Sequence, residues 1–301
     1  MAINVTATDA TLGAVVTDVD LADLDDTSWS EIHQAFLRYG VLIFPDQHLS
    51  EAAQGEFALR FGDTEKLSPK QSRPTITFTN QKPDGSLASA ADQQYRILKG
   101  NEGWHTDSTY MPLASKAAML AALVIPPEGG ETEFADMRAA WDALDEQTQR
   151  KLEPLSAYHS LYYSQSRAGF AHSTDNQYGF HDKGAPLRPL IKTHPETGRK
   201  SIYTGRHAYG IPGMDSDESE EFLDELLEWA CQDLLHGIQT RLHEVLHNHP
   251  NRFVAGVTHL LTFPLGKPYQ RPADELGQQV GNLILQPGTL RDRLTEAVYI
   301  P

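Results

Sequence analysis

The sequence predicts a mainly β protein with flanking helices, built as a barrel or as two packed sheets. Its strand-like stretches are short and are separated by turns. Its helical patterns concentrate in the N-terminal third and after residue 215, and they do not alternate regularly with the strands. Regular alternation is typical of doubly wound parallel sheets, whereas many short strands favour a barrel or double-sheet architecture.

The first predicted elements are a strand and a helix. Residues 10–24 alternate apolar and polar side chains, which indicates a strand that runs into a turn. Residues 25–40 place apolar side chains at helical spacing. We expect Thr27 or Ser28 to cap this helix and Gly40 to end it.

A buried strand and a second helix follow. Residues 40–45 form a short apolar run that Pro45 halts, which indicates a buried strand. Residues 49–62 predict a helix with Ser50 as its N-cap and Gly62 as its C-cap. The polar stretch that comes next, 64–103, predicts a strand at 76–80 and a mobile loop at 82–94. A loop of that length inside a compact domain is often a lid over a site.

The middle of the chain contains further strands and two helices. Residues 117–137 predict two strands on either side of a turn rich in Pro and Gly, and residues 138–155 predict an amphipathic helix. Residues 193–205 predict a hairpin with its tip at 196–198. Residues 215–232 predict a helix whose acidic first turn suits the helix dipole.

The chain changes character after residue 231. Residues 232–301 contain six Lys and Arg against six Asp and Glu, so the net charge of −16 belongs to the preceding residues. Residues 239–250 look helical and residues 252–264 look strand-like. We find no internal repeat, and we expect residues 1–301 to form a single domain with an atypical C-terminal segment.

The amino-acid composition limits the binding partners and the cellular compartment that we expect. A net charge of −16 repels phosphate backbones, so we expect no nucleic-acid partner. The only cysteine is Cys231, which excludes an intrachain disulfide and fits a reducing, cytoplasmic environment. We expect no signal peptide and no membrane span. Homo-oligomerisation stays open.

The stretch WHTDSTY, residues 104–110, places two metal-capable side chains one residue apart. On a strand, His105 and Asp107 would share a face and could take adjacent positions on one metal. A distant histidine would complete the facial triad of non-haem Fe(II) oxygenases and leave the other positions open. On its own, the tripeptide fits equally a surface pair or a hydrogen-bonded histidine.

The surrounding residues point to a family. Residues 104–144 begin with WHTD and continue to GGETEFADM. These motifs resemble those of the TauD/TfdA family of Fe(II)- and 2-oxoglutarate-dependent dioxygenases. The resemblance implies that His105 and Asp107 are iron ligands and that Thr132 binds the far carboxylate of 2-oxoglutarate. It also implies a double-stranded β-helix, or jelly-roll, core.

The resemblance covers about residues 10–231. It includes GVLIFPDQHLS and HPETGRKSIYTGRHAYGIPGMDSDES. The segments at 159–166 and 204–214 are most similar to the aryloxyalkanoate, or phenoxy-herbicide, branch of the family.

Residues 232–301 depart from the family pattern. The segment that supplies the family's second iron-binding histidine is absent, and no Trp follows Trp229. His259 lies 154 residues after His105, close to the family's separation, and is the candidate third ligand. Arg271 is the candidate for the bidentate ion pair with 2-oxoglutarate. The other interpretation of His259 is an ordinary histidine on a strand.

Three side chains are candidates for the substrate pocket. Arg206 could bind a carboxylate, His207 lies beside it in the sequence, and Tyr163 could form a wall against an aromatic ring. Arg206 and His207 could equally be surface charges at a strand end, and Tyr163 could equally be an ordinary core aromatic.

The resemblance implies oxidation of a small organic acid with Fe(II), 2-oxoglutarate and O₂. Hydroxylation of an aryloxyalkanoate beside its ether oxygen would release a phenol and an oxo-acid. An alkylsulfonate is another substrate within reach of the family. Two other classes stay open: an inactive relative whose C-terminal segment has lost the iron site, and a zinc hydrolase that uses His243 and His247, although the sequence has no HExxH motif.

Overall fold

The fold is described from a computed structural model. It describes residues 2–65, 75–93, 95, 98, 101–124, 132–169 and 183–231, together with the backbone of 252–257, 260–264 and 294–300.

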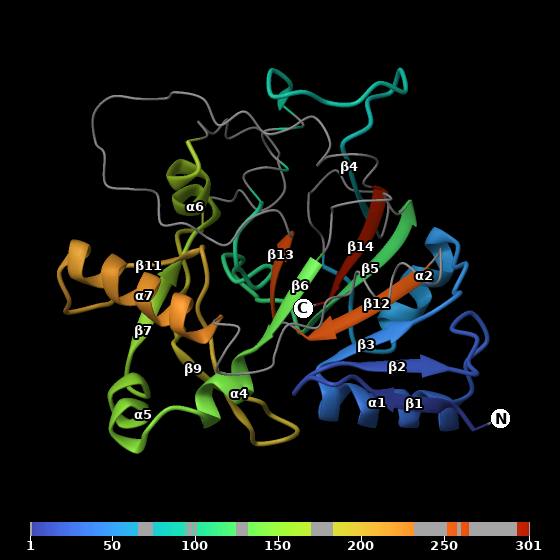
Figure 1. The fold of residues 1–301 in the computed structure, drawn as a ribbon, viewed down its shortest axis with the longest axis horizontal. Helices are drawn as coiled ribbons and strands as arrows, with labels where there is room; N and C mark the ends of the chain where they lie inside the picture. Colours follow the sequence, from blue (N-terminus) through green and yellow to red (C-terminus); the bar gives the residue numbers. More distant parts are fainter. Residues whose placement is uncertain are drawn as a thin grey trace.

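A sheet of seven strands forms one side of the molecule (Figure 1). Its neighbouring strands are antiparallel except for β2 and β3, which are parallel. Two strands from the end of the chain lie inside this sheet and join strands from its first half. In sheet order the strands are β1 (Asn4–Ala7), β2 (Ala14–Thr17), β3 (Val41–Phe44), β12 (Arg252–Val257), β5 (Ala117–Val124), β14 (Leu294–Ile300) and β4 (Ile76–Thr79).

Three smaller sheets complete the β structure in the described part of the chain. One joins β6 (Thr132–Asp136) to β13 (Leu260–Pro264). The others consist of β7 (Ser156–His159) between β8 (Leu187–Pro189) and β11 (Ala208–Tyr209), and of β9 (Ile191–Thr193) with β10 (Lys200–Ile202). The helices are α1 (Asp26–Tyr39), α2 (Glu51–Leu59), α4 (Met137–Asp142), α5 (Glu146–Leu152), α6 (Leu161–Arg167) and α7 (Ser216–Ala230).

Strand β3 is apolar at every position because both of its faces are buried. All four of its side chains have no solvent exposure. Val41 and Ile43 belong to one hydrophobic core, and Leu42 and Phe44 belong to the other. Because successive strand residues point to opposite faces, the main sheet lies between two cores.

Helices α1 and α2 cover one face of the main sheet. They contribute Phe36 and Phe57 to the core that contains Leu42 and Phe44. Phe61, just after α2, makes edge contacts with Phe36 at 5.0 Å between ring centroids. Figure 1 shows α1 lying against β1 and β2.

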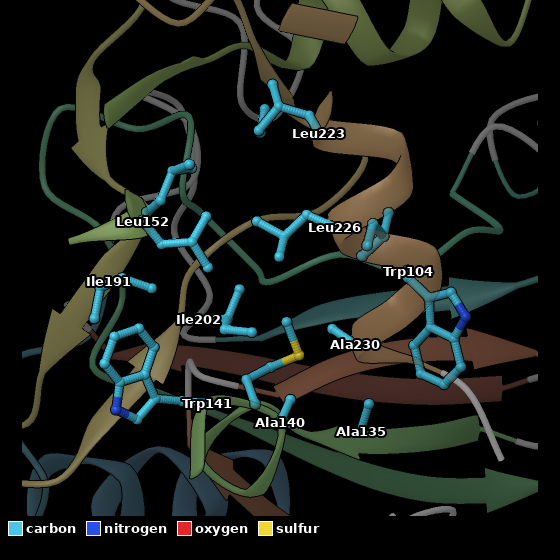
Figure 2. Packing of buried hydrophobic residues seen from close by; sticks show 14 of the residues in the cluster. Trp104, Ala135, Ala140, Trp141, Leu152, Ile191, Ile202, Leu223, Leu226 and Ala230 are labelled. Atoms are coloured by element: carbon cyan, nitrogen blue, oxygen red, sulfur yellow. The ribbon is translucent and has the colours of Figure 1, made fainter. Parts of the chain in front are cut away.

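The second core joins α7 to the smaller sheets. Figure 2 shows Leu226 and Ala230 of α7 facing Trp141 of α4 and Ile202 of β10. Leu152 of α5 and Ile191 of β9 close the same cluster. This packing fixes the strands that position the candidate site.

Several sequence predictions are confirmed. The predicted strands at 40–45 and 76–80 are present as β3 and β4. The hairpin at 193–205 is formed by β9 and β10, with Gly198 at φ 70° in its tip. The predicted helix at 215–232 is α7.

The predicted helix caps are partly wrong. Helix α1 is capped by Asp25, whose Oδ1 accepts from the backbone N–H of Ser28 at 2.7 Å, and not by Thr27 or Ser28. Ser50 caps α2 as expected, but that helix ends at Leu59 and not at Gly62.

The predicted helix at 138–155 is two helices. Helix α4 stops at Asp142, and the side chain of Asp145 then accepts from the backbone N–H groups of Gln147 and Thr148. That capping starts α5 in a new direction.

The two strands predicted within 117–137 are present as β5 and β6, and the strand-like stretch 252–264 contains β12 and β13. Neither of these successive pairs forms a hairpin. Strands β5 and β12 lie in the main sheet, whereas β6 and β13 pair in a separate one. The predicted helix at 239–250 lies outside the described residues. Among the helices that the structure describes, none has the length and apolar character needed to cross a membrane.

Candidate metal and substrate site

His105 and Asp107 lie together, as the tripeptide predicts. Nε2 of His105 is 3.3 Å from Oδ1 of Asp107. Nδ1 of the same ring is 2.7 Å from the carbonyl oxygen of Gly103. A carbonyl can only accept, so Nδ1 carries a proton and Nε2 is the ring nitrogen that faces the Asp107 carboxylate.

The predicted strand conformation of this segment is wrong. Residues 105–110 form no strand and lie mostly in turns. Ser108 has φ 55°, and its carbonyl accepts from the backbone N–H of Met111 at 3.1 Å. The turn, and not the alternation of a strand, brings the two side chains to one place.

These two groups fit a divalent cation. Adjacent ligands of an octahedral ion with bonds of about 2.1 Å lie about 3 Å apart, which is close to the observed Nε2–Oδ1 separation. An imidazole with a carboxylate is also the donor set of non-haem iron sites. Within the described residues, no three His, Cys, Asp or Glu side chains gather as a complete metal site. The described residues thus bring two candidate ligands together and not three.

Arg206 lies against the segment that carries His105. Its backbone N–H donates to the carbonyl of Trp104 at 2.9 Å, and its Nη1 donates to the carbonyl of Glu102 at 3.3 Å. Its Nε and Nη2 are buried and have no hydrogen-bond partner among the residues described. Burial lowers the pKa of Arg206 to about 10, so the guanidinium stays charged at neutral pH.

His207 lies beside the metal pair. Its ring centroid is 5.6 Å from that of His105 and 4.7 Å from that of Tyr110. Its Nδ1 is 2.8 Å from Oγ of Ser164 on α6. Burial, followed by the charge of Arg206, holds the pKa of His207 well below its usual range, so the ring is neutral.

Tyr163 lies on the same helix as Ser164, but its described contacts lead away from the metal pair. Its ring stacks on Tyr209 with centroids 4.7 Å apart. Its hydroxyl accepts from Nη1 of Arg167 at 3.3 Å, and Arg167 also pairs with Asp224 of α7. Burial raises the pKa of the Tyr163 hydroxyl, so it stays protonated.

The candidate residues for 2-oxoglutarate are only partly described. Thr132 is half-buried at the start of β6, in register with Pro264 of β13. His259 and Arg271 lie outside the described residues.

Two residues of this region were not anticipated from the sequence. Oε2 of Glu65 accepts from Oγ of Ser108 at 2.8 Å, and burial raises the pKa of Glu65 to about 7. No sequence signal links it to the motif, because it lies in a polar stretch 43 residues before Ser108. His159 is 1% exposed, and neither ring nitrogen has a partner in the described part of the chain. Its place at the start of HSLYYSQS was the available signal.

Comparison with known proteins agrees with this geometry. The model of the family described as "Taurine catabolism dioxygenase TauD, TfdA family" matches residues 4–272. The match runs past residue 231 and includes His259 and Arg271.

Individual relatives are similar over most of their length. A (S)-phenoxypropionate/alpha-ketoglutarate-dioxygenase of Sphingobium herbicidovorans is 51% identical over 77% of this chain and 80% of its own. An alpha-ketoglutarate-dependent 2,4-dichlorophenoxyacetate dioxygenase of Cupriavidus pinatubonensis is 36% identical over 73% of this chain and 79% of its own.

A solved structure extends the likeness to the whole fold. The crystal structure of AAD-2 in complex with Mn(II) and N-oxalylglycine is 28% identical, with a TM-score of 0.79 over 100% of this chain and 97% of that one. The motif, the paired side chains and these matches agree, and the chain belongs to the TauD/TfdA family of Fe(II)- and 2-oxoglutarate-dependent dioxygenases.

Proposed function

We propose that this dioxygenase oxidises a small aryloxyalkanoic acid whose carboxylate binds Arg206. The observation that carries the proposal is the unpartnered edge of the guanidinium. Nε and Nη2 form one edge of the group, and both are buried without a partner among the described residues. Nη1, on the other side, is already bonded to the carbonyl of Glu102.

That edge suits a carboxylate. Two parallel N–H groups of a guanidinium match the two oxygens of a carboxylate in a bidentate pair. Buried N–H groups of a cation are costly when they have no hydrogen-bond partner, and a bound carboxylate would remove that cost. Since Arg206 is bonded to Trp104, next to His105, the bound acid would lie close to the metal pair.

The metal and co-substrate complete the site. His105 and Asp107 would hold Fe(II), with His259 as the third ligand, and Thr132 with Arg271 would hold the far carboxylate of 2-oxoglutarate. The bound iron, with 2-oxoglutarate and O₂, supplies oxidation of a substrate C–H bond. Hydroxylation beside the ether oxygen of an aryloxyalkanoate would release a phenol and an oxo-acid.

The remaining pocket residues would bind and shield the substrate. His207 is neutral and buried, so it would add no charge to the pocket and would exclude water from it. Because the contacts of Tyr163 lead away from the metal pair, its ring, stacked on Tyr209, would contact only the aromatic end of the acid, the part farthest from the carboxylate. The substrates named for two relatives, (S)-phenoxypropionate and 2,4-dichlorophenoxyacetate, are of this class.

Further properties follow from family membership and composition. We propose that residues 1–301 form one domain with a double-stranded β-helix core and that the C-terminal segment supplies site residues. The single cysteine supports a cytoplasmic location, and homo-oligomerisation is compatible with the fold.

The test is turnover of 2-oxoglutarate and release of phenol with both enantiomers of 2-phenoxypropionate, with phenoxyacetate and with an alkylsulfonate. We expect phenol release from a carboxylate substrate. Arg206→Gln should raise the KM for that acid by about 10- to 100-fold, the value of losing a charge-assisted pair, and leave the KM for 2-oxoglutarate unchanged. The KM of Arg206→Lys for the acid should lie between those of the parent and Arg206→Gln, because lysine keeps the charge but lacks the two parallel N–H groups of the guanidinium.

Arg199→Gln is the matched control, because Arg199 is exposed and pairs with Asp142 on the surface. His105→Ala and Asp107→Ala should abolish turnover. An unchanged KM for the acid in Arg206→Gln would refute the carboxylate site. Full 2-oxoglutarate consumption by either ligand variant would refute the metal site, and preference for the alkylsulfonate would replace the substrate class.

A further inference from the structure

The residue that follows Asp107 has a strained backbone. Ser108 has φ 55°, a conformation that costs a residue with a side chain about 1–2 kcal/mol. Its side chain is fully buried. Such strain persists only where the surroundings over-determine it, and it concentrates at functional sites.

The main chain at and after Ser108 is held by two hydrogen bonds. Its carbonyl accepts from the backbone N–H of Met111. The next carbonyl, of Thr109, accepts from Nε of Arg188 at 3.2 Å. These bonds fix the path of the chain after Asp107.

The side chain of Ser108 is held by Glu65. Its hydroxyl donates to Oε2 of Glu65 at 2.8 Å, across 43 residues of sequence. Within the described residues Glu65 forms no ion pair, and the negative charge of Asp107 acts on it. A largely buried carboxylate beside another carboxylate is costly, so a role limited to packing would be served better by a neutral side chain.

We propose that Glu65 is a positioning residue for the metal ligand Asp107. Its hydrogen bond to Ser108 fixes the turn and thereby directs the Asp107 carboxylate towards Nε2 of His105. The inference rests on the proposed metal site.

The experiment is a titration of the metal-free protein with Mn(II), followed by the electron paramagnetic resonance signal of free Mn(II). Glu65→Ala and Ser108→Ala should each weaken Mn(II) binding by about 10- to 100-fold, as expected when a group that orients a ligand is removed. Glu65→Gln, which keeps an acceptor oxygen, should stay close to the parent protein. The double variant should bind no more weakly than either single variant, because both remove one interaction.

Ser108→Gly separates positioning from strain. Glycine adopts φ 55° without cost but lacks the hydroxyl. The melting temperature of this variant should therefore equal or exceed that of Ser108→Ala, while its binding of Mn(II) should stay weak. A second readout is the visible charge-transfer band of the anaerobic Fe(II)–2-oxoglutarate complex, which should shift in Glu65→Ala and not in Glu65→Gln. Glu56→Ala, an exposed acid on α2, is the matched control for the lost charge.

The outcomes distinguish the inference from the metal site beneath it. If Asp107→Ala loses Mn(II) binding while Glu65→Ala binds as the parent does, the positioning role is refuted and the metal site stands. If Asp107→Ala also binds as the parent does, the metal site itself is refuted. Should Glu65→Ala fail to fold, Glu65→Gln and Ser108→Gly decide the question alone.

Discussion

Oγ of Ser164 lies 2.8 Å from Nδ1 of His207 and 3.0 Å from the carbonyl oxygen of Leu161. A hydroxyl has one proton, and the carbonyl can only accept, so the proton goes to Leu161. Nδ1 of His207 is therefore the donor to Ser164, and its Nε2 is the acceptor. One helix hydroxyl selects the tautomer of an imidazole beside the metal pair.

Ser164→Ala should disturb His207 without removing it. The Nδ1 proton would lose its acceptor in a buried place, which costs about 1–3 kcal/mol of folding free energy. The KM for the acid substrate should rise several-fold because the ring no longer has one fixed tautomer. Urea unfolding and steady-state kinetics measure both effects. Ser166→Ala, on the exposed side of α6, should change neither.

The pH dependence of stability should contain a contribution from His159. Burial, with Arg188 nearby, lowers the pKa of His159 to about 3. An unfolded histidine has a pKa near 6.5, so between these values the unfolded chain binds a proton that the folded chain does not. The folding stability associated with neutral, buried His159 is therefore fully present above pH 6.5 and is lost as the pH falls towards 3.

His159→Phe should make the loss of stability on acidification shallower. The parent should lose on the order of 2 kcal/mol more than the variant between pH 7 and pH 4.5, measured by urea unfolding. His48→Phe, at an exposed histidine, should keep the steep dependence of the parent. Parallel curves for His159→Phe and the parent would contradict the assignment.

Arg138 should be important for stability and not for chemistry. It forms a bidentate pair with Asp136, which is 1% exposed, and donates to the last carbonyls of α1 at Arg38 and Tyr39. Arg138→Leu would leave the Asp136 carboxylate buried without its partner, at a cost of about 3–5 kcal/mol. Arg150→Leu, which breaks an exposed pair on α5, should cost at most about 0.5 kcal/mol.

Gly103 should be required for metal affinity. Its carbonyl orients His105, and its φ of 125° would strain a residue with a side chain, although an added Cβ would make only an ordinary contact with Cδ of Arg206 at 3.5 Å. Gly103→Ala should therefore weaken Mn(II) binding as well as folding. Gly198→Ala also strains a positive φ but meets nothing within 4 Å, so it should lower the melting temperature and leave Mn(II) affinity unchanged.

Much of the site was predictable, although partly for the wrong reason. The spacing of His105 and Asp107 identified the pair, but a turn at Ser108 and not a strand makes them converge. A local motif constrains the chemistry of its residues more strongly than their backbone conformation.

The rest depended on contacts that a linear pattern does not encode. Asp25, Thr27 and Ser28 can all cap a helix, and only the three-dimensional arrangement selects Asp25. The bond between Glu65 and Ser108 spans 43 residues, so no periodicity reports it. The place of Arg206 in the family segment makes it a candidate, but which edge of its guanidinium is free depends on the bond from Nη1 to the carbonyl of Glu102, 104 residues away.

The position of β5 has a consequence for how the protein is made. Its two neighbours in the sheet, β12 and β14, lie well after it in the sequence and leave the ribosome later. Until then the eight residues of β5 have two open edges, each able to pair with another chain. Both later strands must be synthesised before the edges of β5 are covered, so a chain that stops before β12 would aggregate and not yield a partly active enzyme.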